Sequence, residues 1–225
     1  MRKLKIVLPA LSIVLSTFLT HSSVSAAGGS RTFNGMYVGA TIGWSHNQLQ
    51  TRFTQQQVSS TANRTKNSLP VGFHLGMGST TKKKIYLGAE LGVEFDANGK
   101  AKMPSPPAFT ISVPHTVEKT FSMVIAGKFG YNTGKLLPYV MIGPIMSLWR
   151  VNMSGRQVGN QKILPGLALG VGFGYQWGKH VITSTEYRFA LYQKHKLGFK
   201  NGIQDVKVLG DYDSHNLLFK LSFVI

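Results

Sequence analysis

Six ionisable residues of this 225-residue chain occupy positions from which they could form a charge network. Each lies on the less apolar side of a segment in which every second residue is apolar. An unpaired charge inside a protein costs free energy, so charges that share a narrow interior must pair. The pattern predicts a salt-bridge network that plugs an interior, or alternatively one that opens as a gate for ions. The six residues are Glu90, Glu94, Lys128, Glu186, Arg188 and Lys220.

Serine and histidine, the pair used in nucleophilic catalysis, occur side by side as Ser45-His46 and Ser214-His215. Neighbouring residues on a strand face opposite ways, so neither pair can form a hydrogen-bonded nucleophile and base by itself. A serine and a histidine from two different strands remain an alternative. His74 has no histidine or carboxylate at ligand spacing and is better explained as a polar filler than as a metal ligand. We therefore predict no metal, and no nucleotide-binding fingerprint indicates a cofactor.

The segment 85–95 shows which elements must position these residues. Its apolar side chains are at odd positions, and Tyr86, Gly88, Glu90, Gly92 and Glu94 lie between them. Strict alternation is typical of a β-strand. A soluble sandwich has no reason to line its polar face with glycine. In a small membrane barrel, by contrast, apolar residues face lipid and the narrow lumen holds small residues and a few charges.

Eight segments repeat this pattern, and each has about the 9 to 11 residues that a tilted strand needs to cross a bilayer. The fifth is apolar on both faces, so its register stays open, and Pro144 would remove a ladder hydrogen bond within it. The segments are 36–44, 69–77, 85–95, 121–131, 137–148, 166–175, 181–191 and 217–225.

The connections between these segments alternate between long and short. Long connections are expected at 45–68, 96–119, 149–162 and 192–214, and short ones at 78–84, 132–136 and 176–180. Outer-membrane barrels have this asymmetry, with short periplasmic turns and longer outer loops. Lipid offers no partner for a free strand edge, so the sheet must close. The predicted fold is all-β, an eight-stranded antiparallel up-and-down transmembrane β-barrel; a soluble lipocalin-like barrel is the alternative.

The first 26 residues are typical of a secretory signal peptide. Arg2, Lys3 and Lys5 precede an apolar stretch at 6–19, and Val24-Ser25-Ala26 supplies small residues for cleavage. A membrane anchor helix is the alternative, although the stretch is short for one. We expect cleavage near Ala26, a single barrel domain over 27–225, and a location in the outer membrane of a Gram-negative bacterium. The chain has no cysteine, so no disulfide supports this domain.

The chain is strongly basic, with 25 Lys and Arg against 8 Asp and Glu and a net charge of +17. Such a balance often signals nucleic-acid binding, but an exported protein meets little nucleic acid. Lipopolysaccharide phosphates and acidic polymers at host or cell surfaces are the expected counterparts. The simpler alternative is that these charges only solvate loops. Basic residues expected in the outer loops are Arg52, Arg64, Lys66, Lys194, Lys196 and Lys200.

The chain resembles the OmpA-like eight-stranded outer-membrane β-barrel family, which includes small surface antigens of proteobacteria. The resemblance rests on four stretches in this order: 33–40 (FNGMYVGA), 137–140 (LPYV), 186–189 (EYRF) and an alternating aromatic C-terminal strand. It implies insertion by the barrel assembly machinery and a monomeric barrel. The family usually ends on Phe, whereas this sequence ends Phe223-Val224-Ile225.

Three functions are compatible with these observations. The first is a structural and surface-interaction role in which basic loops contact anionic partners, because function on a rigid scaffold usually lies in the loops. The second is a narrow passive channel for ions or small solutes, gated by the lumen network. The third is a lipid A-modifying enzyme, because barrels that deacylate lipid A use Ser and His. We favour the first and expect no enzymatic activity.

Overall fold

The protein is described from a computed structural model, which covers residues 33–55, 58–97, 100–103, 115–153, 156–193, 195–201 and 204–225. No helix in these ranges is long and apolar enough to cross a membrane. Ten strands are present within them: β1 (Gly35–Gln55), β2 (Val58–Thr80), β3 (Ile85–Ala97), β4 (Lys100–Met103), β5 (His115–Tyr131), β6 (Leu136–Met153), β7 (Arg156–Trp177), β8 (Val181–Tyr192), β9 (His195–Asn201) and β10 (Gln204–Val224).

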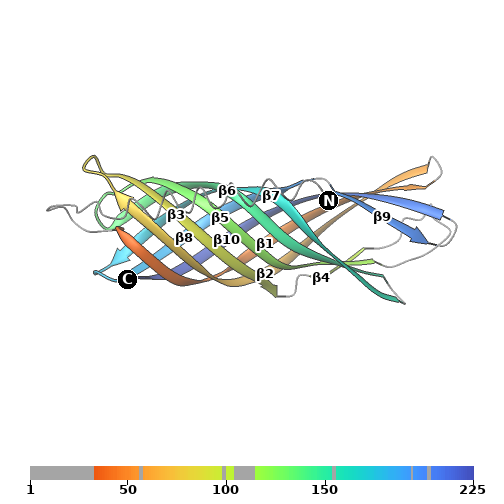
Figure 1. Cartoon of the computed structure of the whole chain (residues 1–225), viewed down its shortest axis with the longest axis horizontal. Coiled ribbons are helices and arrows are strands. Elements are labelled where there is room, and N and C mark those ends of the chain that lie inside the picture. The colour runs from red at the N-terminus through yellow and green to blue at the C-terminus, as the bar shows by residue number, and fades with distance from the viewer. Residues whose placement is uncertain are drawn as a thin grey trace, which may run out of the picture. The chain divides into compact units, whose positions relative to one another are not determined.

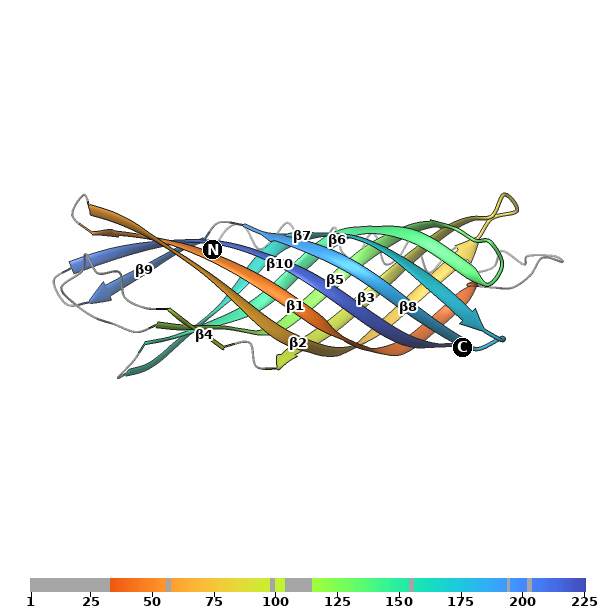
Figure 2. The same cartoon turned by 180° about the vertical axis from the view of Figure 1, so that it is seen from behind.

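Eight of these strands close into a barrel. Their order is β1-β2-β3-β5-β6-β7-β8-β10, and β10 pairs again with β1, every pair being antiparallel. The short strands β4 and β9 only extend the sheet beside β5 and β10. In Figures 1 and 2 the strands run obliquely, and β4 and β9 lie at the opposite end from the C-terminus. The predicted eight-stranded antiparallel barrel is confirmed.

Successive side chains along each strand of the barrel point alternately into the lumen and outward, as β-strand geometry requires. In β1, Tyr37 and Thr41 point into the lumen and are buried, whereas Val38 is 43% and Ile42 52% exposed on the outside. The side chains of the other segments alternate in the predicted sense. The register of β6, which the sequence leaves open, is now defined: Tyr139 and the later odd-numbered residues face the lumen.

Pro144 lies in β6 with its side chain outward, where its missing N–H interrupts the pairing with β5. The β5–β6 register passes from Val124 opposite Ile145 directly to Gly127 opposite Ile142. Beside it, Gly143 lets the two backbones approach closely, since a Cβ built there would lie 1.8 Å from the carbonyl oxygen of Ile125. The pairing with β7 continues without a break through Pro144, so the proline costs hydrogen bonds on one side only.

The strands are much longer than predicted, which corrects the assignment of the long connections. β1 has 21 residues and β2 has 23, so most of 45–68 is a paired hairpin instead of a loop. Strand segments that extend beyond the lipid need no apolar face. They therefore lack the alternation of apolar residues from which the membrane-spanning parts were predicted. The basic residues expected in loops lie in strands as follows: Arg52 in β1, Arg64 and Lys66 in β2, Lys196 and Lys200 in β9. Lys194 lies outside the described residues.

Three short turns connect the strands at the end of the barrel near the C-terminus, at 81–84, 132–135 and 178–180. We call this the short-turn end and the opposite one the long-hairpin end. Gly134 has φ +109° and Gly178 φ +71°, conformations that favour glycine. The predicted signal peptide at 1–26 lies outside the described residues and stays a prediction.

The apolar outer face leads to a quantitative prediction. Leu91, in the middle of β3, points outward. Leu91→Arg should lower the free energy of unfolding in lipid vesicles by about 2–4 kcal/mol, because it places a cation in the hydrocarbon. Urea titration followed by tryptophan fluorescence measures this change. Gln50→Arg, at an exposed site near the far end of β1, is the control and should change stability by less than about 0.5 kcal/mol. Equal losses in both variants would contradict a lipid-facing Leu91.

Candidate functional site

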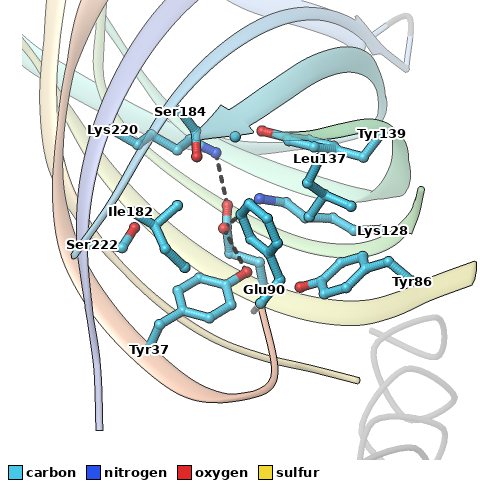
Figure 3. A pocket seen from close by; sticks show the side chains of 12 residues that line it. Tyr37, Tyr86, Glu90, Lys128, Leu137, Tyr139, Ile182, Ser184, Lys220 and Ser222 are labelled. Carbon is cyan, nitrogen blue, oxygen red and sulfur yellow. Dashed lines mark hydrogen bonds and ion pairs between the residues drawn. The ribbon is translucent and has the colours of Figure 1, made fainter. Parts of the chain in front are cut away.

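Four charged side chains from four strands meet in the lumen, and Figure 3 shows three of them, Glu90, Lys128 and Lys220. Glu90 of β3 accepts from Lys128 Nζ of β5 at 2.5 Å through Oε2 and from Lys220 Nζ of β10 at 2.7 Å through Oε1. Lys220 also donates to Glu186 of β8 at 2.8 Å, and Lys128 lies 3.6 Å from the same carboxylate. All four side chains are buried. Two carboxylates and two ammonium groups therefore form a neutral ring of ion pairs, which we call the lumen ring.

Two tyrosines complete the lumen ring, and glycines make room for them. Tyr37 donates its hydroxyl to Glu90 at 3.0 Å, and Tyr139 donates to Glu186 at 2.9 Å. Gly76 is the cross-strand partner of Tyr37, and a Cβ built on it would lie 2.3 Å from the tyrosine ring. Gly172 stands in the same relation to Tyr139, at 2.7 Å. The glycine-rich lumen face is thus the surface against which the tyrosine rings lie.

A second ion pair lies further toward the long-hairpin end. Arg188 of β8 donates through Nη2 to both carboxylate oxygens of Glu94 in β3. Both side chains are buried, and the two strands are not neighbours in the sheet, so the pair spans the lumen. The structure thus brings together all six charged residues singled out in the sequence, four in the lumen ring and two in this pair.

A third ion pair was missed by the sequence analysis because both partners fell within the predicted loop 96–119. Lys119 Nζ lies 3.2 Å from Asp96 Oδ2, and Ser68 donates to the other oxygen of Asp96 at 2.6 Å. Asp96 follows Glu94 by two residues and therefore lies on the same face of the strand. Extending the alternating pattern of the segment 85–95 to Asp96 would have placed this residue in the lumen. Lys119 has an odd number whereas Lys128 has an even one, yet both face the lumen, because the register shifts between Lys119 and Phe121. This bulge left no signal in the sequence.

Two apolar clusters lie in the lumen, one on either side of the lumen ring. The one at the short-turn end contains Phe33, Tyr86, Leu137, Tyr139 and Ile182. The other contains Leu49, Val124, Ala126, Met141, Ile145, Trp149, Leu164, Ala168, Ala190, Tyr192 and Tyr212. A cavity of about 30 Å³ lies beside the lumen ring (Figure 3), which is room for about one or two water molecules.

The two adjacent Ser-His pairs do not form a hydrogen-bonded nucleophile and base. Ser45 and Ser214 are buried on the lumen side, while His46 and His215 are on the outer face, where they bond to Asn67 and Tyr187. His74 does contact a serine: its Nε2 lies 2.7 Å from Ser222 Oγ, and its Nδ1 lies 2.9 Å from Thr41 Oγ1.

This contact is buried in the lumen, where no lipid reaches it. No group of three or more His, Cys, Asp or Glu residues in the described ranges could hold a metal ion.

The ion pair between Glu94 and Arg188 can be tested by a double-mutant cycle. Glu94→Leu should lower the free energy of unfolding by about 3–5 kcal/mol, because it leaves a buried guanidinium without its partner. Adding Arg188→Met should recover most of that loss, since the charge is then removed as well. Urea unfolding measures both variants. Glu118→Leu, at a half-exposed position, is the control; a double variant as unstable as Glu94→Leu would contradict the pairing.

Three solved structures match the chain over most of its length. OprG of Pseudomonas aeruginosa is 10% identical over 85% of this chain and 96% of its own, with a TM-score of 0.58. Neisserial surface protein A (NspA) is 13% identical over 85% and 98%, with a TM-score of 0.45. Ail of Yersinia pestis, in complex with the heparin analogue sucrose octasulfate, is 12% identical over 84% and 99%, with a TM-score of 0.40. At these identities the likeness to OprG supports the fold alone.

A family model supplies the relationship. No curated protein matches the chain. The model described as "Outer membrane protein beta-barrel domain" matches residues 12–223, which is nearly the whole sequence. The match agrees with the closed barrel, and it confirms the resemblance to small OmpA-like barrels. The chain therefore belongs to the outer-membrane β-barrel proteins of Gram-negative bacteria.

Proposed function

We propose that this chain is a closed, non-conducting barrel that supports a basic surface-interaction region at its long-hairpin end. The observation that carries the proposal is the filling of the lumen. Apolar clusters lie on either side of the lumen ring, and the cavity beside the ring, of about 30 Å³, has room for about one or two water molecules. A barrel whose interior is occupied in this way offers its ends, and not its lumen, to other molecules.

The length of the strands supports the same proposal. β1, β2, β7 and β10 have 21 to 23 residues each, whereas about 9–11 suffice to cross a bilayer. About half of each strand thus extends beyond the membrane as paired sheet. A paired hairpin presents its side chains with less conformational freedom than a loop, which lowers the entropic cost of binding. In outer-membrane barrels the longer connections face the cell exterior.

Charge defines the class of partner. Of the 8 acidic residues in the sequence, Glu90, Glu94, Asp96 and Glu186 pair with cations in the lumen. Few acids therefore remain to offset the basic residues elsewhere. The expected partners are therefore anionic, namely lipopolysaccharide phosphates in the same membrane and polyanions of a host or cell surface. The proposal includes export by the signal peptide with cleavage near Ala26, insertion by the barrel assembly machinery as a monomer, and no enzymatic step.

The competing proposal, a narrow channel gated by the lumen ring, differs in its conductance. Purified wild-type protein and Glu90→Ala should both be silent in planar lipid bilayers, because the apolar clusters remain in place when one carboxylate is removed. A general porin inserted under the same conditions is the positive control. Reproducible single-channel steps in the wild type that change in size with Glu90→Ala would overturn the closed barrel and favour the gated channel.

The surface role predicts that whole cells bind a soluble polyanion. Cells that display the wild type should bind fluorescent heparin, and Arg52→Gln/Arg64→Gln/Lys66→Gln should reduce binding about threefold or more, because each cation adds about 0.2–1 kcal/mol of attraction at a hydrated surface. Flow cytometry at low and high salt measures the effect. Surface charge is screened by salt, so binding must fall as ionic strength rises.

The matched control for this experiment removes the same amount of charge at the other end of the barrel. Lys82→Gln/Lys83→Gln/Lys84→Gln alters the first short turn, which faces the periplasm and is out of reach of external heparin. It should leave binding to whole cells unchanged. Equal losses in the two triple variants, or none in the first, would contradict the proposed region.

A further inference from the structure

The short-turn end carries basic side chains and no carboxylate side chain in its three turns. Turn residues 81–84, 132–135 and 178–180 include no Asp or Glu, and every basic residue among them is exposed. In the part of the chain that the structure describes, none of these lysines forms an ion pair with a carboxylate. The basic residues are Lys82, Lys83, Lys84, Lys135, Lys179 and His180.

Backbone hydrogen bonds join these turns into one continuous rim although they lie far apart in the sequence. The N–H of Asn132 donates to the carbonyl of Lys84 at 2.8 Å, which links the first turn to the second. The N–H of Gln176 donates to the carbonyl of Lys135 at 2.9 Å, which links the second to the third. We call the basic residues of this rim the lysine rim.

Aromatic side chains fix the depth of the lysine rim in the membrane. Tyr131 and Trp177 end strands β5 and β7 immediately before two of the turns, and they are 50% and 60% exposed on the lipid-facing side. The rings of Tyr175 and Trp177 pack edge to face, with centroids 4.8 Å apart. Tyrosine and tryptophan at strand ends lie at the level of the lipid headgroups. Lys135 and Lys179, a few residues further on, therefore lie beside the headgroup phosphates.

We propose that the lysine rim binds the phosphate groups of anionic phospholipids, of the phosphatidylglycerol class, in the periplasmic leaflet. Each turn extends only three or four residues beyond its strands, so the ammonium groups stay at the membrane surface. Lysine side chains reach from an apolar surface to the interface with their stems in contact with lipid. Basic residues held near an anionic membrane surface each contribute favourably to binding, and here five lysines share one rim.

Trp177 is a natural reporter for this lipid contact. The protein has three tryptophans, of which Trp149 is buried in the lumen and out of reach of lipid, while Trp44 is exposed further along β1 toward the long-hairpin end. In a Trp44→Phe background, quenching by brominated lipid therefore reports the surroundings of Trp177. In a Trp177→Phe background it reports those of Trp44.

The experiment compares brominated phosphatidylglycerol with brominated phosphatidylcholine in vesicles that contain the folded full-length protein. Phosphatidylglycerol should quench Trp177 with about a two- to fivefold preference at low salt. Replacing the five lysines of the rim by glutamine should bring the ratio to about one. The quenching of Trp44 should be unchanged by those replacements. Heat-modifiable migration on gels checks that each variant is folded.

Salt provides a second measurement that needs no substitution in the rim. The preference at Trp177 should fall toward one when ionic strength rises to about 0.5 M, because salt screens exposed charges. Equal quenching by the two lipids at low salt would overturn the proposal, as would a preference that survives both salt and the lysine replacements. Lysine-dependent retention on purified peptidoglycan, without any lipid preference, would assign the rim to the cell wall and overturn it as well.

Discussion

Hydrogen bonding between β1 and β10 removes the two free edges that a sheet of eight strands would expose to lipid. The pairing runs from Tyr37 opposite Val224 to Thr54 opposite Lys207. Because hydrocarbon cannot satisfy backbone N–H and C=O groups, this closure is the condition for crossing the membrane at all. It also sets the width of the lumen, which in a barrel of eight strands is only as wide as the side chains that fill it.

A lumen of that width restricts what each inward position can hold. Large rings need a neighbour without a side chain, and so Tyr37 lies over Gly76. Charges need a partner within reach, and so Lys220 contacts both Glu90 and Glu186. The contacts also fix register, because a slip of one residue in β10 would turn Lys220 outward toward lipid.

Much of this arrangement could be predicted from the sequence because lipid demands an apolar side chain at every second position. That demand revealed the eight spanning segments and placed Glu94 and Arg188 on the lumen face. It ends where the strands leave the membrane, so the extensions of β1 and β2 looked like loops. Lys119 escaped detection because a bulge reverses its parity. The register of β6 could not be predicted because both faces of this strand are apolar. Its lumen-facing residues, such as Ile145, lie in an apolar part of the lumen.

The lumen ring draws on strands that are distant in the sequence, and this has a consequence for the order of assembly. Glu90 lies in β3 and Glu186 in β8, and Lys220, one of the two cations that lie beside both carboxylates, is in the last strand. While β10 is undocked, neither carboxylate has that partner, and Lys128 of β5 is the ring cation that remains beside them. Docking of β10 supplies the second cation and completes the ring. The ring is therefore complete only in the closed barrel, and its ion pairs favour closure.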